Sequence, residues 1–172
     1  MTDDEVVRIP LRSRDGSVRA WAIVDREDAD LAELRWSYRS PNGANEYAYR
    51  SSGQRHLHRI VLERVIGRSL DIHEQCDHID GSGLNNKRSN LRAATVGQNH
   101  ANRSRPWGGS RYLGVSFDQA RGRWKAQVQR GGNVVFQGRY DTEEAAARAY
   151  DRAAVEHHGE FARPNFHDGG DA

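Results

Sequence analysis

The sequence predicts an α+β fold organised as two modules, and three observations support this prediction. Segments that alternate apolar and polar residues dominate the first 50 positions, as in half-buried strands. A helical period of apolar residues follows at residues 56–67. After residue 110, three strand-like segments precede one long helical segment, which predicts a second unit with its own core.

The first 50 residues predict short strands and one helix. VVRIPL and SVRAWAIV flank the turn sequence RDG, and NEYAYR predicts a further strand. Residues 25–36 predict a helix that turns Leu31 and Leu34 inward, and PNG at residues 41–43 predicts a turn. We expect this region to pack against the segment that follows, with four aromatic residues in its core: Trp21, Trp36, Tyr47 and Tyr49.

The middle of the chain predicts a helix, a hairpin and a second helix. Apolar residues recur at helical spacing over residues 56–67, and Gly67 stops the first helix. A loop rich in glycine and asparagine at residues 81–86 then separates two strand-like segments. The second helix opens near Thr95.

The last third of the chain predicts a three-stranded antiparallel sheet packed on one helix. SRYLGVSFD, RWKAQVQ and NVVFQGRY alternate as strands do, with turns at residues 120–122 and 131–132. Asp141 is the predicted helix cap, Glu144 follows three residues later, and Gly159 lies just past the helix end. A face of alanines lets this helix lie close to the sheet.

The net charge of +2 hides an uneven distribution. Residues 87–130 carry ten Lys/Arg and a single acid, Asp118, whereas the segments on either side are acidic on balance. A solvated basic face is the simple interpretation of such a run. Aromatic residues are interleaved with these charges, however, and this combination favours a nucleic acid partner. The interleaved aromatics are Trp107, Tyr112, Phe117 and Trp124.

Composition excludes several classes of protein. A single cysteine excludes an internal disulfide and a zinc site built on paired cysteines. No apolar run approaches the roughly 18 residues of a membrane span, and the N-terminus lacks the pattern of a signal peptide. We therefore expect a soluble, cytoplasmic protein with no membrane partner and no small-molecule substrate.

Asp77, His78 and Asn99 predict a site for phosphodiester hydrolysis. Hydrolysis requires a base for the water and a cation for the leaving oxygen. A hard cation keeps several waters, so two protein oxygens, from Asp77 and Asn99, can suffice to hold it. In a regular strand His78 would point away from Asp77, unless the strand twists or ends there. The spacing alone leaves a second interpretation open, in which DHIDG is only a hairpin corner.

A resemblance decides between these interpretations. HRIVLE (58–63), DHIDG (77–81), LNN (84–86), RSNLR (88–92) and QNHANR (98–103) together resemble HNH endonucleases of the phage and intron-associated branch, which has asparagine at the last motif position. The resemblance implies the ββα-metal fold, and it suggests a phage-encoded protein acting in a bacterial host.

The same resemblance implies roles for individual residues. His78 is the expected general base, and Asn90 is the expected amide of the catalytic motif that ties the loop together. Asp77 and Asn99 are the expected ligands of one metal ion per active site. An asparagine in place of a final histidine favours Mg²⁺ or Mn²⁺ over a transition metal.

Other polar residues of this segment have weaker assignments. His58 matches a recurrent family position, but we expect a packed, hydrogen-bonded structural histidine there rather than a ligand. Asn102 and Arg103 either contact DNA phosphates or only cap the end of the helix. Arg88 and Arg92 complete the DNA contacts predicted for this module.

The C-terminal module resembles a plant DNA-binding domain. YLGVSF, GRWKAQV and FQGRYDTEEAAARAYDRAAVEHHGEFARPNF are similar to the ethylene-response-factor (APETALA-type) domain over residues 111–166. The resemblance implies that the sheet binds DNA and that the helix supports it. Leu113, Ser116 and Asp118 stand where plant domains place arginines, so the plant sequence preference is not expected to carry over.

Strand alternation selects the expected DNA-contacting side chains of this module. Arg123 and Lys125 share one face of the sheet, whereas Trp124 and Ala126 share the other. The simpler alternative is a polar face that meets only water. The predicted contacts come from the first two strands and their surroundings: Arg111, Arg121, Arg123, Lys125 and Arg130.

These observations together predict a metal-dependent, homing-endonuclease-like enzyme that nicks double-stranded DNA. A single Asp-His-Asn site per chain motivates the nicking prediction, and the chain could act as a monomer or a homodimer. The alternatives are a non-catalytic DNA-binding regulator derived from such a nuclease, and an RNA-binding or RNA-cutting protein. The predicted parts are an N-terminal α+β region packing on the nuclease core, the nuclease domain, a linker, the DNA-binding domain and a tail: residues 1–55, 56–104, 105–110, 111–166 and 167–172.

Overall fold

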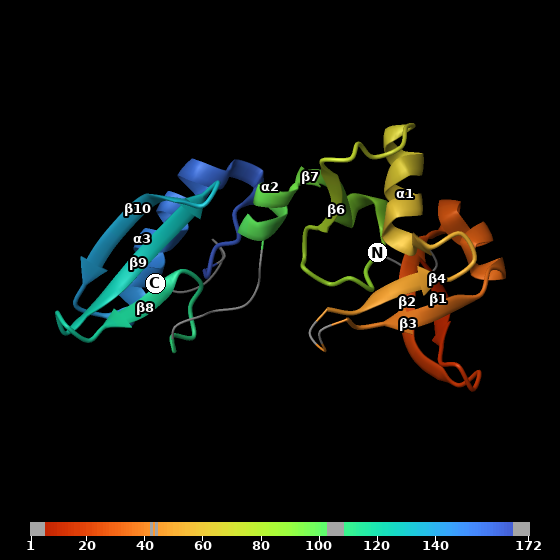
Figure 1. The fold of residues 1–172 in the computed structure, drawn as a ribbon, viewed down its shortest axis with the longest axis horizontal. Helices are drawn as coiled ribbons and strands as arrows, with labels where there is room; N and C mark the ends of the chain where they lie inside the picture. The colour runs from red at the N-terminus through yellow and green to blue at the C-terminus, as the bar shows by residue number, and fades with distance from the viewer. Residues whose placement is uncertain (1–5, 42, 44, 103–108, 167–172) are drawn as a thin grey trace. The chain divides into compact units, whose positions relative to one another are not determined.

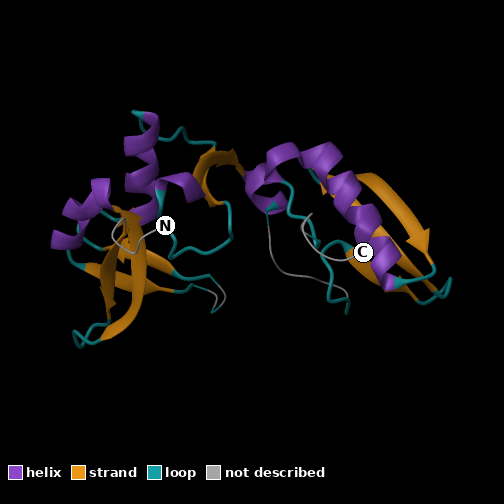
Figure 2. Cartoon of the chain, turned by 180° about the vertical axis from the view of Figure 1, so that it is seen from behind, coloured by secondary structure: helices purple, strands orange, loops and turns teal. Residues whose placement is uncertain are grey.

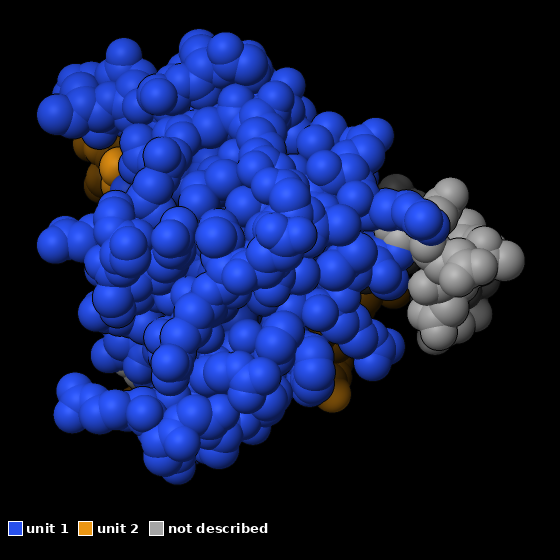
Figure 3. Space-filling model, turned by 90° about the vertical axis from the view of Figure 1, so that its right-hand side faces the viewer, with its two compact units in different colours: residues 1–95 blue, residues 96–172 orange. Residues whose placement is uncertain are grey.

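The computed structural model describes residues 6–41, 43, 45–102 and 109–166. The chain divides into two compact units, residues 1–95 and 96–172, which are coloured separately in Figure 3. Most of the predicted linker lies outside the described residues, as do the predicted tail, Trp107 and the middle residue of the predicted PNG turn.

The first unit contains a five-stranded sheet with the strand order β2-β1-β3-β4-β5 (Figures 1 and 2). The predicted strands VVRIPL, SVRAWAIV and NEYAYR are confirmed, and two short strands join them. β1 pairs antiparallel with β2 and parallel with β3, and the remaining neighbours are antiparallel. The strands are β1 (Val6–Arg12), β2 (Val18–Asp25), β3 (Trp36–Arg39), β4 (Tyr47–Arg50) and β5 (Arg55–His56).

The helix predicted at residues 25–36 is wrong in type and in extent. The segment forms a 3-10 helix, η2 (Arg26–Glu33), and Trp36 already belongs to β3. Trp36 is fully buried, and its indole Nε1 donates a hydrogen bond to the Leu31 carbonyl at 2.7 Å. Burial of this large ring outweighs the weak helical preference of so short a segment. Leu31 is buried as predicted, and Leu34 is half-buried against the same core.

The helix predicted at residues 56–67 is confirmed as α1 (Leu57–Ile66). It ends at Gly67, which adopts the left-handed conformation with φ 68°. The helix buries an apolar stripe in the core of the unit, which also contains Trp36.

Trp21, predicted as a core residue, is instead 53% exposed. The alternation of β2 explains this error, because its alanines at positions 20 and 22 face the core and Trp21 therefore faces outward. Tyr47 and Tyr49 are half-buried.

A two-stranded antiparallel hairpin completes the first unit. Its strands are β6 (Glu74–His78) and β7 (Leu91–Thr95), and the connecting loop ends in the 3-10 turn η3 (Arg88–Asn90). The loop lies beside β2, since the Ile23 amide donates to the Leu84 carbonyl and the Ile23 carbonyl accepts from the Asn86 amide. The N-terminal sheet therefore holds the loop of the predicted catalytic hairpin.

The second unit begins with helix α2 (Val96–Ala101) and contains a three-stranded antiparallel sheet of order β10-β9-β8. The strands are β8 (Val115–Asp118), β9 (Arg123–Arg130) and β10 (Asn133–Tyr140). Helix α3 (Glu143–His158) covers one face of this sheet, and the 3-10 turn η4 (Gly159–Phe161) follows (Figure 2). The predicted sheet packed on one helix is confirmed.

The cap of α3 differs from the prediction by one residue. Thr142 is the N-cap, and its Oγ1 accepts a hydrogen bond from the Ala145 amide at 3.1 Å. Asp141, the predicted cap, is exposed and pairs with Arg123 at 2.8 Å. Gly159 ends the helix as predicted. No helix in the described part of the chain is long and apolar enough to cross a membrane.

Candidate active site

Asp77 and His78 are the last two residues of β6, and both are buried. Their partners across the hairpin are Arg92 and Leu91. Neighbouring residues of a regular strand point to opposite faces, but the strand ends at His78. The two side chains have different anchors as a result: Arg92 holds the carboxylate, and the loop after β6 holds the imidazole.

The loop orients the His78 ring through Asn86. His78 Nε2 lies 3.4 Å from Asn86 Oδ1, and Asn86 is fully buried. The Asn86 amide group donates to the Leu84 carbonyl at 3.0 Å, so its oxygen is the atom directed at His78. His78 Nε2 therefore carries the proton, and Nδ1 is the basic nitrogen.

Burial lowers the pKa of His78, although the hydrogen bond to the Asn86 amide oxygen and the charges of Asp80 and Asp77 act in the opposite direction. A lowered pKa keeps the imidazole neutral at neutral pH. A neutral imidazole with a defined basic nitrogen is able to accept a proton from a water molecule.

His78 also belongs to a cluster of aromatic rings. The His58 ring lies 5.0 Å from that of His78, nearly perpendicular to it, and stacks on His56 at 5.1 Å. Tyr47 lies 5.5 Å from His58 and 6.2 Å from His78, measured between ring centroids. His58 Nδ1 is buried and has no hydrogen-bond partner among the described residues, so His58 is packed as predicted but lacks the predicted hydrogen bond at this nitrogen. Desolvation therefore lowers the pKa of His58 well below its usual range, and His78 and His56 add to this effect.

Asn90 ties the loop between β6 and β7 together. Its Nδ2 donates to Asp80 Oδ1 at 2.9 Å and to the Asn85 carbonyl at 2.8 Å, and its Oδ1 accepts from the Asp80 amide at 3.0 Å. The loop also approaches β4 closely at Gly83, where a Cβ atom would lie 2.1 Å from the Glu46 carbonyl oxygen. These contacts fix the path of the loop and hence the position of Asn86.

Two predicted DNA-contacting arginines neutralise buried carboxylates in this structure. Arg92 Nε donates to Asp77 Oδ2 at 2.8 Å, and this arginine side chain is only 13% exposed. Arg88 Nε donates to Asp28 Oδ2 at 2.8 Å, and Asp28 is fully buried. Asp28 lies 60 positions earlier in the chain, so the sequence contains no local signal for this pairing.

The remaining residues predicted for this module lie elsewhere. Asn99 is half-buried in α2, and Asn102 follows that helix and is buried. Both belong to the second unit, whereas Asp77 and His78 belong to the first. Arg103 lies outside the described residues.

The two predicted metal ligands both carry oxygen donors. Within the described ranges, no group of three or more His, Cys, Asp or Glu side chains is arranged to hold a metal ion. Asp77 and Asn99 offer one carboxylate and one amide oxygen, and Mg²⁺ prefers oxygen ligands and retains several waters.

Comparison with known proteins identifies the family of this segment. A family model described as HNH endonuclease matches residues 55–101, which include His56, His58 and the hairpin that carries His78. An uncharacterized HNH endonuclease of Acanthamoeba polyphaga mimivirus is 38% identical over 162 residues, covering 94% of this chain and 82% of the viral protein. The chain belongs to the HNH endonuclease family. No solved structure matches it significantly.

This HNH endonuclease also contains an AP2-like region. The AP2-like ethylene-responsive transcription factor TOE2 of Arabidopsis thaliana is 49% identical over 57 residues, which cover 33% of this chain and 12% of the plant protein. APETALA2-like protein 2 of Oryza sativa subsp. indica is 47% identical over 57 residues, covering 33% of this chain and 13% of the relative. The similarity to the plant proteins therefore concerns one region and not their full length.

The sheet of the second unit presents a polar face opposite α3. Arg123 and Lys125 lie on this face, since the intervening Trp124 and Ala126 pack in the core. Arg139 of β10 pairs with Lys125 and shares the face, and its Nε donates to Asp118 at 2.9 Å. Arg139 is absent from the DNA contacts predicted from the sequence, although the alternation of NVVFQGRY already indicates which face of the sheet it shares.

The other predicted contacts of this unit surround that face. Arg121 pairs with Asp118 at 3.4 Å, and Arg130 is exposed at the end of β9. Arg111 pairs instead with Glu143 and Glu144 at the start of α3. Arg111 is therefore held by acids of the helix, whereas Arg121 is held by an acid of the sheet.

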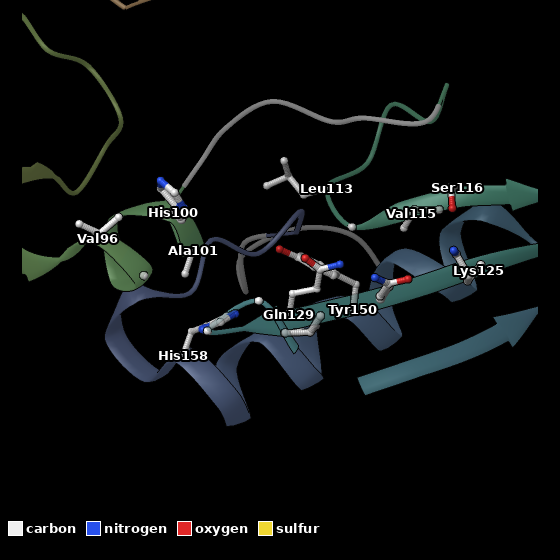
Figure 4. Close-up of a pocket in the computed structure, with 16 residues that line it drawn as sticks. Val96, His100, Ala101, Leu113, Val115, Ser116, Lys125, Gln129, Tyr150 and His158 are labelled. Carbon is white, nitrogen blue, oxygen red and sulfur yellow. The ribbon is translucent and has the colours of Figure 1, made fainter. Parts of the chain in front are cut away.

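A cavity of about 810 Å³ also lies in the second unit (Figure 4). Val96 and His100 of α2 line it together with Lys125 of β9 and with Tyr150 and His158 of α3. The cavity shares Lys125 with the polar face of the sheet.

Proposed function

We propose that this HNH endonuclease hydrolyses phosphodiester bonds of double-stranded DNA in the presence of Mg²⁺ or Mn²⁺, with one ion per active site, and that it nicks one strand. The observation that supports this most strongly is the buried Asp77-His78 pair, in which Asn86 defines the basic nitrogen of His78. The proposed ββα-metal arrangement comprises β6, β7 and α2.

His78 acts as the general base in this proposal. Its Nδ1 accepts the proton of the attacking water, and the neutral state of the ring is favoured because burial lowers its pKa. Asn86 keeps the ring in the required tautomer. Asn90 has no chemical role here and maintains the loop that carries Asn86.

Asp77 and Asn99 would hold the cation, which when bound supplies positive charge at the scissile phosphate and the leaving oxygen. Arg92 orients the Asp77 carboxylate through the 2.8 Å contact with Oδ2. Arg88 and Arg92 are committed to carboxylates, so we assign phosphate contacts in the nuclease module to Asn102 and Arg103.

The AP2-like region would select the DNA site. A small catalytic module contacts few bases, so site choice must come largely from added contacts. Arg123, Lys125 and Arg139 offer cationic groups on one sheet face. This division of labour corresponds to a nuclease domain at residues 56–104 and a targeting domain at residues 111–166, with residues 105–110 as linker.

The decisive experiment incubates supercoiled plasmid with the purified protein and Mg²⁺. We expect nicked product from the wild type, and none from His78→Ala or in the presence of EDTA. His73→Ala is a matched control, since His73 is exposed just before β6. No cleavage of any DNA, with salt-sensitive binding intact, would instead support the non-catalytic DNA-binding protein.

A time course tests the nicking proposal separately. One active site per monomer should give open-circular DNA first and linear DNA only later. Linear product in equal amount from the earliest times, with an enzyme shown to be monomeric, would overturn nicking and leave hydrolysis itself untouched.

A further inference from the structure

The sheet of the first unit presents an outer face of arginine and aromatic side chains. Leu11, Trp36 and Ala48 are buried in the core, so the alternating positions beside them point to the opposite face. One row crosses four strands in register, from Arg12 through Ser37 and Tyr49 to His56. We define the arginine-aromatic face by five residues: Arg12, Arg39, Tyr47, Tyr49 and His56.

This face leads to the catalytic histidine. The Tyr49 and His56 rings lie 5.1 Å apart, and His56 stacks on His58 at the same distance. His58 in turn contacts His78 at 5.0 Å. Tyr47, the cross-strand partner of Arg39, lies beside both His58 and His78. The face therefore adjoins the cluster of rings that contains the proposed base.

The charge of the face suits an anion. Arg12 and Arg39 have no carboxylate partner among the described residues, although Arg12 Nη1 donates a hydrogen bond to the Gly16 carbonyl at 3.0 Å. Other arginines of the same unit each pair with at least one carboxylate: Arg64, Arg68 and Arg88. The guanidinium carbon of Arg39 lies 4.3 Å from the centre of the Tyr49 ring, and Arg39 is exposed.

The acids near this face are already engaged. Asp25 is the only acid within strands β1–β5, and its carboxylate accepts from the Arg88 amide at 2.7 Å. Glu46, just before β4, accepts from the Tyr38 hydroxyl at 2.7 Å. Trp21 adds a large exposed aromatic surface to the same side of the sheet.

We propose that the arginine-aromatic face binds the sugar-phosphate backbone of the DNA strand that enters the active site. The proposal rests on the proposed nuclease function. Guanidinium groups without a carboxylate partner suit phosphate oxygens, to which they can donate two parallel hydrogen bonds, and the adjoining rings can pack against sugars. Residues 1–55 thereby become a DNA-guiding platform as well as support for the catalytic loop.

Arg39→Ala provides the test, measured as DNA affinity over a range of salt concentrations without divalent metal. Loss of one charged phosphate contact should weaken binding about tenfold and reduce the salt slope by about 0.9. Arg39→Lys should keep the salt slope and lose part of the affinity, because it retains the charge but not the planar group.

Arg50→Ala is the matched control. Arg50 follows Tyr49 on β4, so its side chain lies on the opposite side of the sheet, and its register partner on β5 is Arg55. The substitution therefore removes the same charge from a different face. We expect its affinity and salt slope to equal those of the wild type. Equal values for Arg39→Ala and Arg50→Ala would overturn the proposal.

Photocross-linking of DNA to the otherwise unaltered protein gives a second measurement that does not depend on any variant folding. Cross-links should map to the peptide that contains Tyr47 and Tyr49, and their absence there would count against the proposal. Self-association that Arg39→Ala abolishes without DNA would overturn it in favour of a second copy of the chain. None of these measurements requires cleavage, so a failure of the nuclease function is distinguishable from a failure of this surface.

Discussion

The Asn86 amide oxygen favours the tautomer of His78 in which Nδ1 is basic, so in the proposed mechanism this buried residue contributes to turnover without being the base. We predict that Asn86→Ala lowers kcat by roughly 10- to 100-fold with little change in KM, because the ring loses its orientation. Plasmid nicking kinetics would measure this. Asn85→Ala is the control, since Asn85 hydrogen bonds with Asp80 and not with His78. A folded Asn86→Ala with unchanged kcat would contradict the assigned tautomer.

The pair between Arg92 and Asp77 is buried on both sides, so its loss leaves a buried carboxylate without this cation. We predict that Arg92→Ala destabilises the metal-free protein by about 3–5 kcal/mol. Arg55→Ala removes an exposed ion pair with Glu63 and should cost less than about 1 kcal/mol. Urea unfolding of both variants measures the difference, and equal costs would show that the Asp77 pair contributes no more than an exposed one.

Helix α3 offers a test of capping. Thr142→Ala removes the hydrogen bond to the Ala145 amide and should destabilise the second unit by about 1 kcal/mol. Asp141→Ala removes only an exposed pair with Arg123 and should cost less than about 0.5 kcal/mol. Thermal unfolding distinguishes the two, and the reverse order would place the cap at Asp141 after all.

The junction of β5 and α1 should make the protein sensitive to acid. Burial lowers the pKa of His58 well below 6.5, so the unfolded chain takes up this proton first as the pH falls. The contribution of His58 to the free energy of unfolding is therefore fully present above pH 6.5. It declines as the pH falls toward the folded-state pKa, by up to about 1.4 kcal/mol per pH unit for one group. His56 and His78, whose pKa values are also lowered by burial, contribute in the same direction.

His58→Phe should flatten this dependence in urea unfolding between about pH 7 and about pH 5. The replacement keeps a ring and removes a buried nitrogen that has no hydrogen-bond partner. His73→Phe, at an exposed position, should leave the pH dependence unchanged. An equally steep decline in both variants would exclude His58 as a source of the acid sensitivity.

At the scale of elements, the sequence predicted helices and strands correctly where the apolar periodicity extends over many residues. The strands of the second unit and α1 follow directly from alternation and helical spacing. β3 and β5 have too few residues to show a period, and burial of Trp36 draws the end of the predicted N-terminal helix into the sheet. Local pattern cannot represent such a tertiary effect.

The candidate site was predictable only where its residues are neighbours in the chain. Asp77 and His78 form a motif, but the ring contacts of His78 with Tyr47 and His58 span 31 and 20 positions. The carboxylate partners of Arg88 are likewise distant in sequence, and so charge counting alone does not reveal that this arginine is paired. Such contacts emerge only when the sheet and the hairpin are both in place.

For the molecule as a whole, the basic run at residues 87–130 divides into two classes of charge. Arg88 and Arg92 neutralise buried acids in the first unit and contribute little free positive charge. The pair of Arg123 with Asp141 in the AP2-like region is instead exposed, so we expect the cations of this run that bind DNA to lie on the polar sheet face of that region. Affinity and turnover should consequently respond to different substitutions.

The double variant Arg123→Ala/Lys125→Ala tests this separation. We predict that the DNA dissociation constant rises by at least about tenfold and that the salt slope falls by up to about 1.8, because two phosphate contacts are lost. The kcat at saturating DNA should stay near that of the wild type, since the proposed base His78 belongs to the other unit. Arg152→Ala, on the exposed side of α3, removes a charge of the same sign and should change neither quantity. A loss of kcat without a loss of affinity would mean that this sheet acts in the chemical step and not in targeting.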